Sequence, residues 1–238
     1  MPKLLHILLI LSLLAVNHKT ELPDSKRASD VREKVWPTLQ KELRTTGFRD
    51  DQHIYLRIFK DPCVLEVWTR SGDQYKLFKS YPVCYFSGGL GTKTRDGDGK
   101  SPEGYYNIKP GQLNPVSHYH LAINIGYPNA LEQHLGYKGS SIMIHGYCAS
   151  IGCYAMTDPQ IEEIYTLVYE AFLHGQKSID LSILPFKMDA EHMKANASSP
   201  YLTVWKNLKG GYDLFEKTHV PSVVSVHNKT YIFMENRL

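Results

Sequence analysis

Residues 142–156 read IMIHGYCASIGCYAM, and this stretch carries the most informative pattern in the chain. Its apolar start predicts a strand ending on His145, and a loop of small residues then leads to Gly152-Cys153, shortly before a helix. This arrangement is typical of nucleophilic catalysis, in which a cysteine thiolate attacks a carbonyl carbon and a histidine takes, then returns, the proton. Gly152 leaves room for a substrate at the sulfur of Cys153, and the backbone N–H groups of these two residues are candidates for an oxyanion hole.

Two other interpretations of this stretch remain open. His145, Cys148 and Cys153 are ligand types that zinc accepts, but structural zinc sites usually have four ligands, and no fourth lies nearby in the sequence. We therefore expect no metal. The last interpretation is purely structural, with a Cys148–Cys153 disulfide or simply small buried thiols.

The residues around this stretch predict a fold rich in strands. Apolar side chains recur with a period of two from residue 54 onward, without strand–helix–strand alternation, which indicates a β-meander. The predicted strands lie at 54–60, 64–68, 75–86, 105–108, 121–125, 141–145, 179–184, 223–226 and 230–233.

Helical spacing of apolar residues appears in three further places. We expect Pro37 to kink or split the first helix, Asp158 to cap the second, and Gly210-Gly211 to interrupt the third. The predicted helices lie at 26–46, from 158 to just before Gly175, and at 201–215.

Two glycine-containing loops are expected, at 87–104 and 127–139. The first is long and polar, and a loop of this length in a compact domain is usually functional or mobile. It has neither the G-x-x-x-x-G-K-[ST] pattern nor a following helix, so it does not predict a phosphate site. Asp96 and Asp98 begin a weak calcium-loop pattern that lacks its later ligands.

Composition narrows the class of protein. Of the 238 residues, 42% are hydrophobic and 21% charged, which excludes a disordered chain. The net charge of +3 (27 basic less 24 acidic residues) is too small to indicate a nucleic-acid partner.

The N-terminus resembles an export signal. Lys3 precedes an apolar run over 4–16, which is shorter than the ~20 residues that span a bilayer. We interpret residues 1–25 as a signal peptide or an N-terminal anchor and expect the rest of the chain to be exported, which would permit disulfides. If Cys153 is a free nucleophile, the other three cysteines form at most one bridge. The sequence does not determine which two of Cys63, Cys84 and Cys148 pair, and the pairing that we expect is Cys63 with Cys84.

These motifs resemble the L,D-transpeptidase catalytic domain of the YkuD/ErfK superfamily. His145-Gly146 matches the family's His-Gly pair, residues 150–153 (SIGC) match its S-x-G-C motif, and residues 101–106 (SPEGYY) match its T-P-x-G-x-[FY] stretch. The chain is most similar to the YafK-like branch. The further stretches that carry this similarity are SGGLG (87–91), AINIGYPNA (122–130), Pro185-Phe186 and Gly211-Tyr212-Asp213.

The resemblance implies an α+β fold, a mostly β sandwich-like catalytic domain with flanking helices. It implies a cysteine enzyme that is acylated by peptidoglycan stem peptides and needs no organic cofactor. Cys153 carries over as nucleophile, His145 as general base and acid, Gly146 as the carbonyl that orients the imidazole, and the backbone of Gly152 and Cys153 as oxyanion hole. Weaker substrate-binding candidates are Ser150, Tyr127, Tyr106 and Lys100.

The sequence also departs from the family pattern. Ile151 stands where many members have a second histidine, and Ala155 stands where many have Arg or Asn. The general base therefore has to be His145, while the acceptor remains open. The principal expectation is a transpeptidase of the periplasm or cell envelope. The alternatives are a hydrolase that cuts a stem-peptide or peptidoglycan–lipoprotein amide and a non-catalytic wall-binding module.

The expected division of the chain follows from these assignments. After the N-terminal segment come a helical segment at 26–49, a catalytic domain at 50–185 and an α/β extension at 186–238 that packs on it. Peptidoglycan stem peptides are the expected partners, with a wall-attached lipoprotein as a further candidate and a membrane tether through residues 1–25 as an option.

Overall fold

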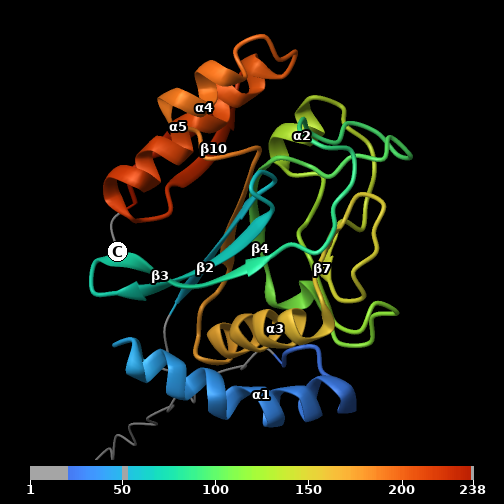
Figure 1. The fold of residues 1–238 in the computed structure, drawn as a ribbon, viewed down its shortest axis with the longest axis vertical. Coiled ribbons are helices and arrows are strands. Elements are labelled where there is room, and N and C mark those ends of the chain that lie inside the picture. Colours follow the sequence, from blue (N-terminus) through green and yellow to red (C-terminus); the bar gives the residue numbers. More distant parts are fainter. Residues whose placement is uncertain (1–20, 50–52, 237–238) are drawn as a thin grey trace, which may run out of the picture.

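The computed structural model describes residues 21–49 and 53–236, so most of the predicted export signal lies outside the described residues. The fold is α+β, as predicted (Figure 1). Its helices are α1 (Lys26–Thr45), α2 (Ala130–His134), α3 (Asp158–Leu173), α4 (Ala190–Ala195) and α5 (Leu202–Thr218). Its strands are β1 (Ile54–Phe59), β2 (Val64–Ser71), β3 (Gln74–Pro82), β4 (Gly104–Ile108), β5 (Leu113–Asn114), β6 (Ala122–Asn124), β7 (Met143–His145), β8 (Tyr154–Ala155), β9 (Ile179–Leu184), β10 (Val223–His227) and β11 (Thr230–Met234).

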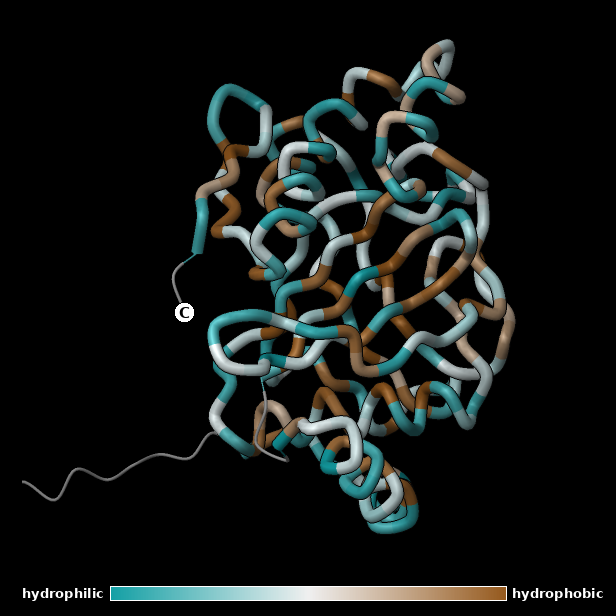
Figure 2. Tube along the Cα trace, turned by 60° about the vertical axis from the view of Figure 1, so that its left-hand side comes forward, coloured by the Kyte–Doolittle hydropathy of each residue, from teal (hydrophilic) through white to brown (hydrophobic). Residues whose placement is uncertain are grey.

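The larger sheet has five strands in the order β3-β2-β1-β9-β4. The predicted meander is confirmed for β1, β2 and β3, which pair antiparallel in sequence order. Strand β9 then pairs parallel with β1 and antiparallel with β4. Every residue of β1 is buried, as expected of a strand enclosed by neighbours and covered on both faces. Figure 2 shows hydrophobic stretches gathered along the strands inside the molecule.

The second sheet, β5-β6-β7-β8, is built from very short strands. Strands β7 and β8 run parallel, with Ile144 opposite Tyr154 and His145 opposite Ala155. The chain between them, residues 146–153, has to return to the starting end of β7 within one short loop. This loop therefore joins the predicted histidine to the predicted cysteine.

Helices α1 and α3 lie side by side next to the sheet (Figure 1). Of the two outcomes expected at Pro37, a kink or a split, the split does not occur, since α1 runs unbroken through this residue. The buried residues Leu39 and Leu43 hold the helix on the core, and this packing outweighs the one backbone hydrogen bond that proline removes. The predicted cap of α3 is off by one residue, because Thr157 is the N-cap and shares a capping box with Gln160.

Residues after 185 form α4, α5 and an antiparallel pair of strands, β10 and β11, at the two strands predicted for 223–226 and 230–233. These elements pack against the sheet through one apolar cluster. Its most buried members include Phe59, Leu184 and Trp205. Gly210-Gly211 do not interrupt α5, contrary to the prediction. A Cβ on Gly211 would collide with the rings of Tyr105 and Phe233, so glycine serves close packing there.

Two helices were not predicted. Helix α2 lies inside the expected loop at 127–139, where Asn129 and Glu132 form a capping box, and α4 precedes α5. Within the described residues, no helix has the length and apolar character needed to cross a bilayer.

Candidate active site

His145 ends β7 and is 2% exposed. Its Nδ1 lies 2.6 Å from the carbonyl oxygen of Gly146, and its ring packs at 4.6 Å, centroid to centroid, from the ring of Tyr119. Burial lowers the pKa of this imidazole below 6.5, against a smaller opposing effect of the Gly146 carbonyl. At neutral pH the ring is therefore uncharged. Since Nδ1–H donates to Gly146, Nε2 is left as the proton acceptor.

Cys153 immediately precedes β8, so it lies across from Met143 on the neighbouring strand. The backbone N–H of Met143 donates to its sulfur at 3.3 Å, and the sulfur lies 3.6 Å from the carbonyl oxygen of Ser141. Burial raises the pKa of this thiol above 9.0, and the Met143 N–H, Ser150 and the charge of Lys93 only partly offset it. The resting residue is a neutral thiol, which requires a general base for attack.

The loop between His145 and Cys153 has an unusual backbone conformation and a backbone hydrogen bond to α3. Tyr147, Cys148 and Gly152 have φ values of 71°, 37° and 102°. The N–H of Tyr147 donates to Asp158 Oδ1 at 2.8 Å. A Cβ on Gly146 would lie only 2.5 Å from that same oxygen, which explains why glycine follows the histidine.

A disulfide joins Cys84 to Cys148, while Cys63 and Cys153 are free thiols. The predicted Cys63–Cys84 bridge is therefore wrong, because the return of the loop brings Cys148 to the end of β3. The alternative Cys148–Cys153 bridge is wrong for the same reason. Because Cys148 is part of the disulfide, its thiol is not free to act as one of the three zinc ligands considered above. No group of three potential His, Cys, Asp or Glu ligands occurs in the described part of the chain.

The two backbone donors predicted for the oxyanion hole already have acceptors. Gly152 N–H donates to Ser87 Oγ at 2.8 Å, and Cys153 N–H donates to Ser150 Oγ at 2.7 Å. Ser150, a substrate-binding candidate, thus lies directly against the backbone of Cys153. Ser87 comes from the glycine-rich loop and was not among the predicted site residues.

Two other candidates hold loops in place through their polar groups. Lys100 Nζ donates to the carbonyl of Gly88 at 2.9 Å, within the glycine-rich loop. The hydroxyl of Tyr127 donates to the carbonyls of Lys93 and Lys138, at 3.3 Å each. Through these contacts, both residues have a structural role in holding the loops. A role of either residue in substrate binding stays a prediction.

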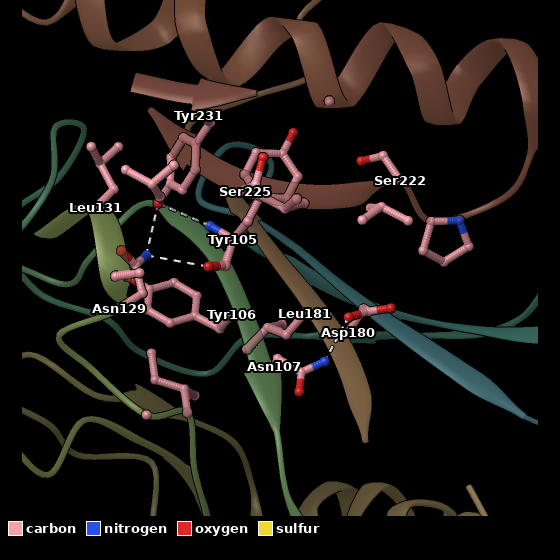
Figure 3. A pocket seen from close by; sticks show the side chains of 18 of the residues that line it. Tyr105, Tyr106, Asn107, Asn129, Leu131, Asp180, Leu181, Ser222, Ser225 and Tyr231 are labelled. Atoms are coloured by element: carbon pink, nitrogen blue, oxygen red, sulfur yellow. Dashed lines mark hydrogen bonds between the residues drawn. The ribbon is translucent and has the colours of Figure 1, made fainter. Parts of the chain in front are cut away.

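Tyr106 lines a separate cavity of about 560 Å³ between β4, α2 and β10 (Figure 3). Its hydroxyl donates to Glu132 Oε1 at 2.6 Å, and burial raises the pKa of Glu132 to about 7. Neither His145 nor Cys153 lines this cavity. The structure therefore does not bring Tyr106 together with the predicted catalytic pair.

Exposed apolar side chains stand near the loop that carries Cys153. Tyr147 is 67% exposed and Ile151 is 85% exposed, on the loop itself. Tyr119, which packs on His145, and Tyr85, which pairs with Ala155, are also large and exposed. Such a concentration of exposed apolar surface is typical of a binding region.

Sequence reasoning missed Ser87 and Tyr119 because neither lies near the His–Cys motif in the chain. The only available signal for Ser87 was its position at the start of SGGLG, in a loop already expected to be functional. Tyr119 had no signal, since its contact with His145 depends on the pairing of β6 and β7.

Comparison with known proteins gives a consistent set of similarities. Residues 55–179 match the YkuD family, described as the L,D-transpeptidase catalytic domain. A protein of Escherichia coli (strain K12), named "Putative L,D-transpeptidase YafK", is 49% identical over 179 residues, which cover 75% of this chain and 73% of that protein.

Two solved structures resemble the fold more distantly. A mutant of the helical cell shape determining protein Pgp2 from Campylobacter jejuni is 21% identical, with a TM-score of 0.47, covering 80% of this chain and 67% of that one. Bd1075 of Bdellovibrio bacteriovorus is 20% identical, with a TM-score of 0.37, covering 70% of this chain and 61% of that one.

Proposed function

This chain belongs to the YkuD family of L,D-transpeptidase catalytic domains, and on that premise we propose that it is an exported cysteine acyltransferase acting on peptidoglycan stem peptides. The nucleophile is Cys153 and the general base is His145. The observation that carries the proposal is the orientation of His145 by the Gly146 carbonyl, on the strand next to the one that Cys153 precedes. The pKa directions of both groups make His145 a neutral base and Cys153 a neutral thiol, as this mechanism requires.

Acylation begins when the thiol proton of Cys153 passes to Nε2 of His145. The sulfur attacks a backbone carbonyl carbon at an L-to-D junction of the stem peptide, and the carbonyl π electrons move to oxygen. The C–N bond then breaks, and the leaving amine takes the proton from His145. The product is a thioester on Cys153.

Resolution of the thioester uses the same base in reverse order. An incoming amine loses a proton to His145 as it attacks the thioester carbonyl, and Cys153 leaves as a thiol. If the amine belongs to a second stem peptide or a wall-attached lipoprotein, the product is a new amide. If water takes its place, the enzyme is a hydrolase, which is the alternative within the same chemistry.

We also propose the chain's organisation. Residues 1–25 direct export to the periplasm or cell envelope, as a signal peptide or as a membrane tether. Residues 50–185 form the catalytic domain, the helical segment at 26–49 packs on it, and residues 186–238 form an extension that supports it. The apolar cluster that joins Phe59 to Trp205 supports this assignment of the extension.

A product assay tests the function. The purified full chain would be incubated with tetrapeptide muropeptides, and separately with a muropeptide–lipoprotein conjugate, and the products read by mass spectrometry. A mass gain that joins two stem peptides identifies a transpeptidase, and release of the lipoprotein with addition of water identifies a hydrolase. Cys153→Ala should abolish both, and Cys63→Ala, which removes the other free thiol, should abolish neither. Unchanged substrates with the wild-type chain would support a non-catalytic module instead.

A further inference from the structure

The segment from Cys84 to Ser87 holds the loop of Cys153 at three successive points. Cys84 is bonded to Cys148, and Tyr85 exchanges backbone hydrogen bonds with Ala155 at 3.1 and 2.9 Å. Ser87 Oγ then accepts the N–H of Gly152 at 2.8 Å. A covalent bond at Cys84 and backbone hydrogen bonds at Tyr85, just before Ser87, thus help to determine where the Ser87 hydroxyl lies relative to Cys153.

The backbone of Ser87 is itself held by buried groups. Ser101 N–H donates to the Ser87 carbonyl at 3.1 Å, and Ser87 N–H donates to Ser101 Oγ at 3.3 Å. The Ser101 carbonyl accepts from Lys60 Nζ at 2.7 Å, and Lys60 pairs with Glu103, both side chains being fully buried. A hydroxyl supported in this way is preorganised, as an electrostatic catalyst must be.

The hydrogen bonds at the backbone of Gly152 and Cys153 involve four donors, and one of them, a hydroxyl proton, is left unused within the described residues. The N–H groups of Gly152 and Cys153 are already used, and Ser150 Oγ–H is also used, since it donates to the carbonyl of Cys153 at 3.0 Å. Ser87 Oγ accepts from Gly152, and among the described residues its own proton has no acceptor within hydrogen-bonding distance. Ser87 is only half-buried, so this proton can reach a bound substrate.

We propose that the Ser87 hydroxyl is the oxyanion donor of this enzyme, in place of the Gly152 N–H. The Gly152 N–H polarises the hydroxyl by donating to its oxygen, which strengthens the hydrogen bond that the hydroxyl can donate. This assignment rests on the proposed function, because it concerns the same acylation of Cys153.

The step balances without any further reactant. As the Cys153 sulfur–carbon bond forms, the carbonyl π electrons become a lone pair on oxygen, and the Ser87 O–H donates a hydrogen bond to that oxygen without transferring its proton. When the carbonyl re-forms, the leaving group departs and this hydrogen bond weakens. The thiol proton follows its path through His145 throughout.

Two simpler roles for Ser87 predict different results. If its hydroxyl only blocks the oxyanion hole, Ser87→Ala would free the Gly152 N–H, and acylation would become faster. If it only stabilises the loop, Ser87→Ala would disturb every reaction of Cys153, including those that form no oxyanion.

The test compares two reactions of Cys153 in the full chain, namely acylation by p-nitrophenyl acetate, which passes through an oxyanion, and alkylation by iodoacetamide, which does not. We expect Ser87→Ala to slow acylation by at least about tenfold, since loss of one oxyanion donor typically costs ~10²–10³ in rate. Alkylation should stay within about twofold of wild type. Ser87→Thr, which keeps the hydroxyl, should recover most of the acylation rate. Ser80→Ala, at an exposed serine on β3, should change neither reaction.

Each other outcome overturns the assignment. Faster acylation in Ser87→Ala would show a blocking role, and equal loss of acylation and alkylation would show a structural one. Cys153→Ala separates this test from that of the proposed function. If it abolishes acylation while Ser87→Ala has no effect, the nucleophile stands and the oxyanion donor is a different group.

Discussion

Nδ1 of His145 lies 2.6 Å from the carbonyl oxygen of Gly146, the residue that follows it in the chain. A neutral imidazole in this contact carries its proton on Nδ1, and this leaves Nε2 as the base. A histidine held by its own neighbour keeps this tautomer without a buried carboxylate, and among the described residues no acidic side chain raises the pKa of the imidazole.

The pH dependence of acylation follows from this arrangement. Because burial lowers the pKa of His145, the base stays unprotonated to a pH below 6.5, and the acid limb of kcat/KM for acylation should lie below that value. Because burial raises the pKa of Cys153, iodoacetamide alkylation should still be increasing at pH 9. Stopped-flow measurement of both reactions from pH 4.5 to 10 provides the check. An alkylation rate that is already constant at pH 7 would show a thiolate–imidazolium pair instead.

Gly146→Ala should impair both stability and activity. The new Cβ would lie 2.5 Å from Asp158 Oδ1 and 3.0 Å from the carbonyl oxygen of Tyr119, so the loop must shift. We expect a loss of about 1–3 kcal/mol in the free energy of unfolding, with slower acylation because the carbonyl that holds His145 moves. Gly111→Ala is the matched control, since a Cβ there meets nothing within 4 Å. Denaturant unfolding of both variants measures the difference, and equal stability would contradict the steric argument.

The Cys84–Cys148 disulfide should matter for both folding and catalysis. It closes a loop with a sequence separation of 64, and a bridge of this kind typically contributes roughly 2–4 kcal/mol. The double variant Cys84→Ser/Cys148→Ser should therefore melt at a lower temperature and turn over more slowly, because Cys148 lies in the loop between His145 and Cys153. Cys63→Ser, at a free thiol outside that loop, serves as control. Full activity of the double variant, measured well below its melting temperature, would show that hydrogen bonds alone position the loop.

Glu132 should make stability depend on pH. Burial raises its pKa from 4.5 to about 7, so between these values the folded protein retains a proton that the unfolded chain has released. Stability contributed by this group therefore falls as pH rises from 4.5 to 7, by up to roughly 3 kcal/mol. The side chain in Glu132→Gln does not titrate. The melting temperature of this variant, relative to that of wild type, should therefore rise as the pH increases from 4.5 to 7. Glu191→Gln, at an exposed position on α4, should show no such rise in melting temperature relative to wild type. A constant difference across the window would mean that Glu132 is ionised throughout.

The sequence was most informative where structure is local. The period of two at 54–60 predicted β1, and the apolar runs at 223–226 and 230–233 predicted β10 and β11, since each pattern depends on residues close in the chain. Pairings between residues far apart in the chain could not be predicted from the sequence. Nothing near residue 179 indicates that β9 pairs parallel with β1, and nothing near Cys84 indicates Cys148 as its partner.

The same limit applies at the site. His145, Gly152 and Cys153 lie within one motif and were recognised from it. Ser87, which comes from 65 residues away to accept the Gly152 N–H, follows only from the completed fold. Gly211 was misread for a related reason, because glycine propensity disfavours a helix while the packing against Tyr105 and Phe233 requires it.

Strand β9 lies between β1 and β4, although both of those strands precede it in the chain by more than seventy residues. On a ribosome, β1 and β4 therefore emerge without the strand that separates them, and the five-stranded sheet cannot close until residue 184 has left the exit tunnel. Such long-range pairing slows folding and leaves strand edges open in the meantime. A nascent chain stalled before β9 should be sensitive to proteases across its first half, and one stalled well beyond it should resist them.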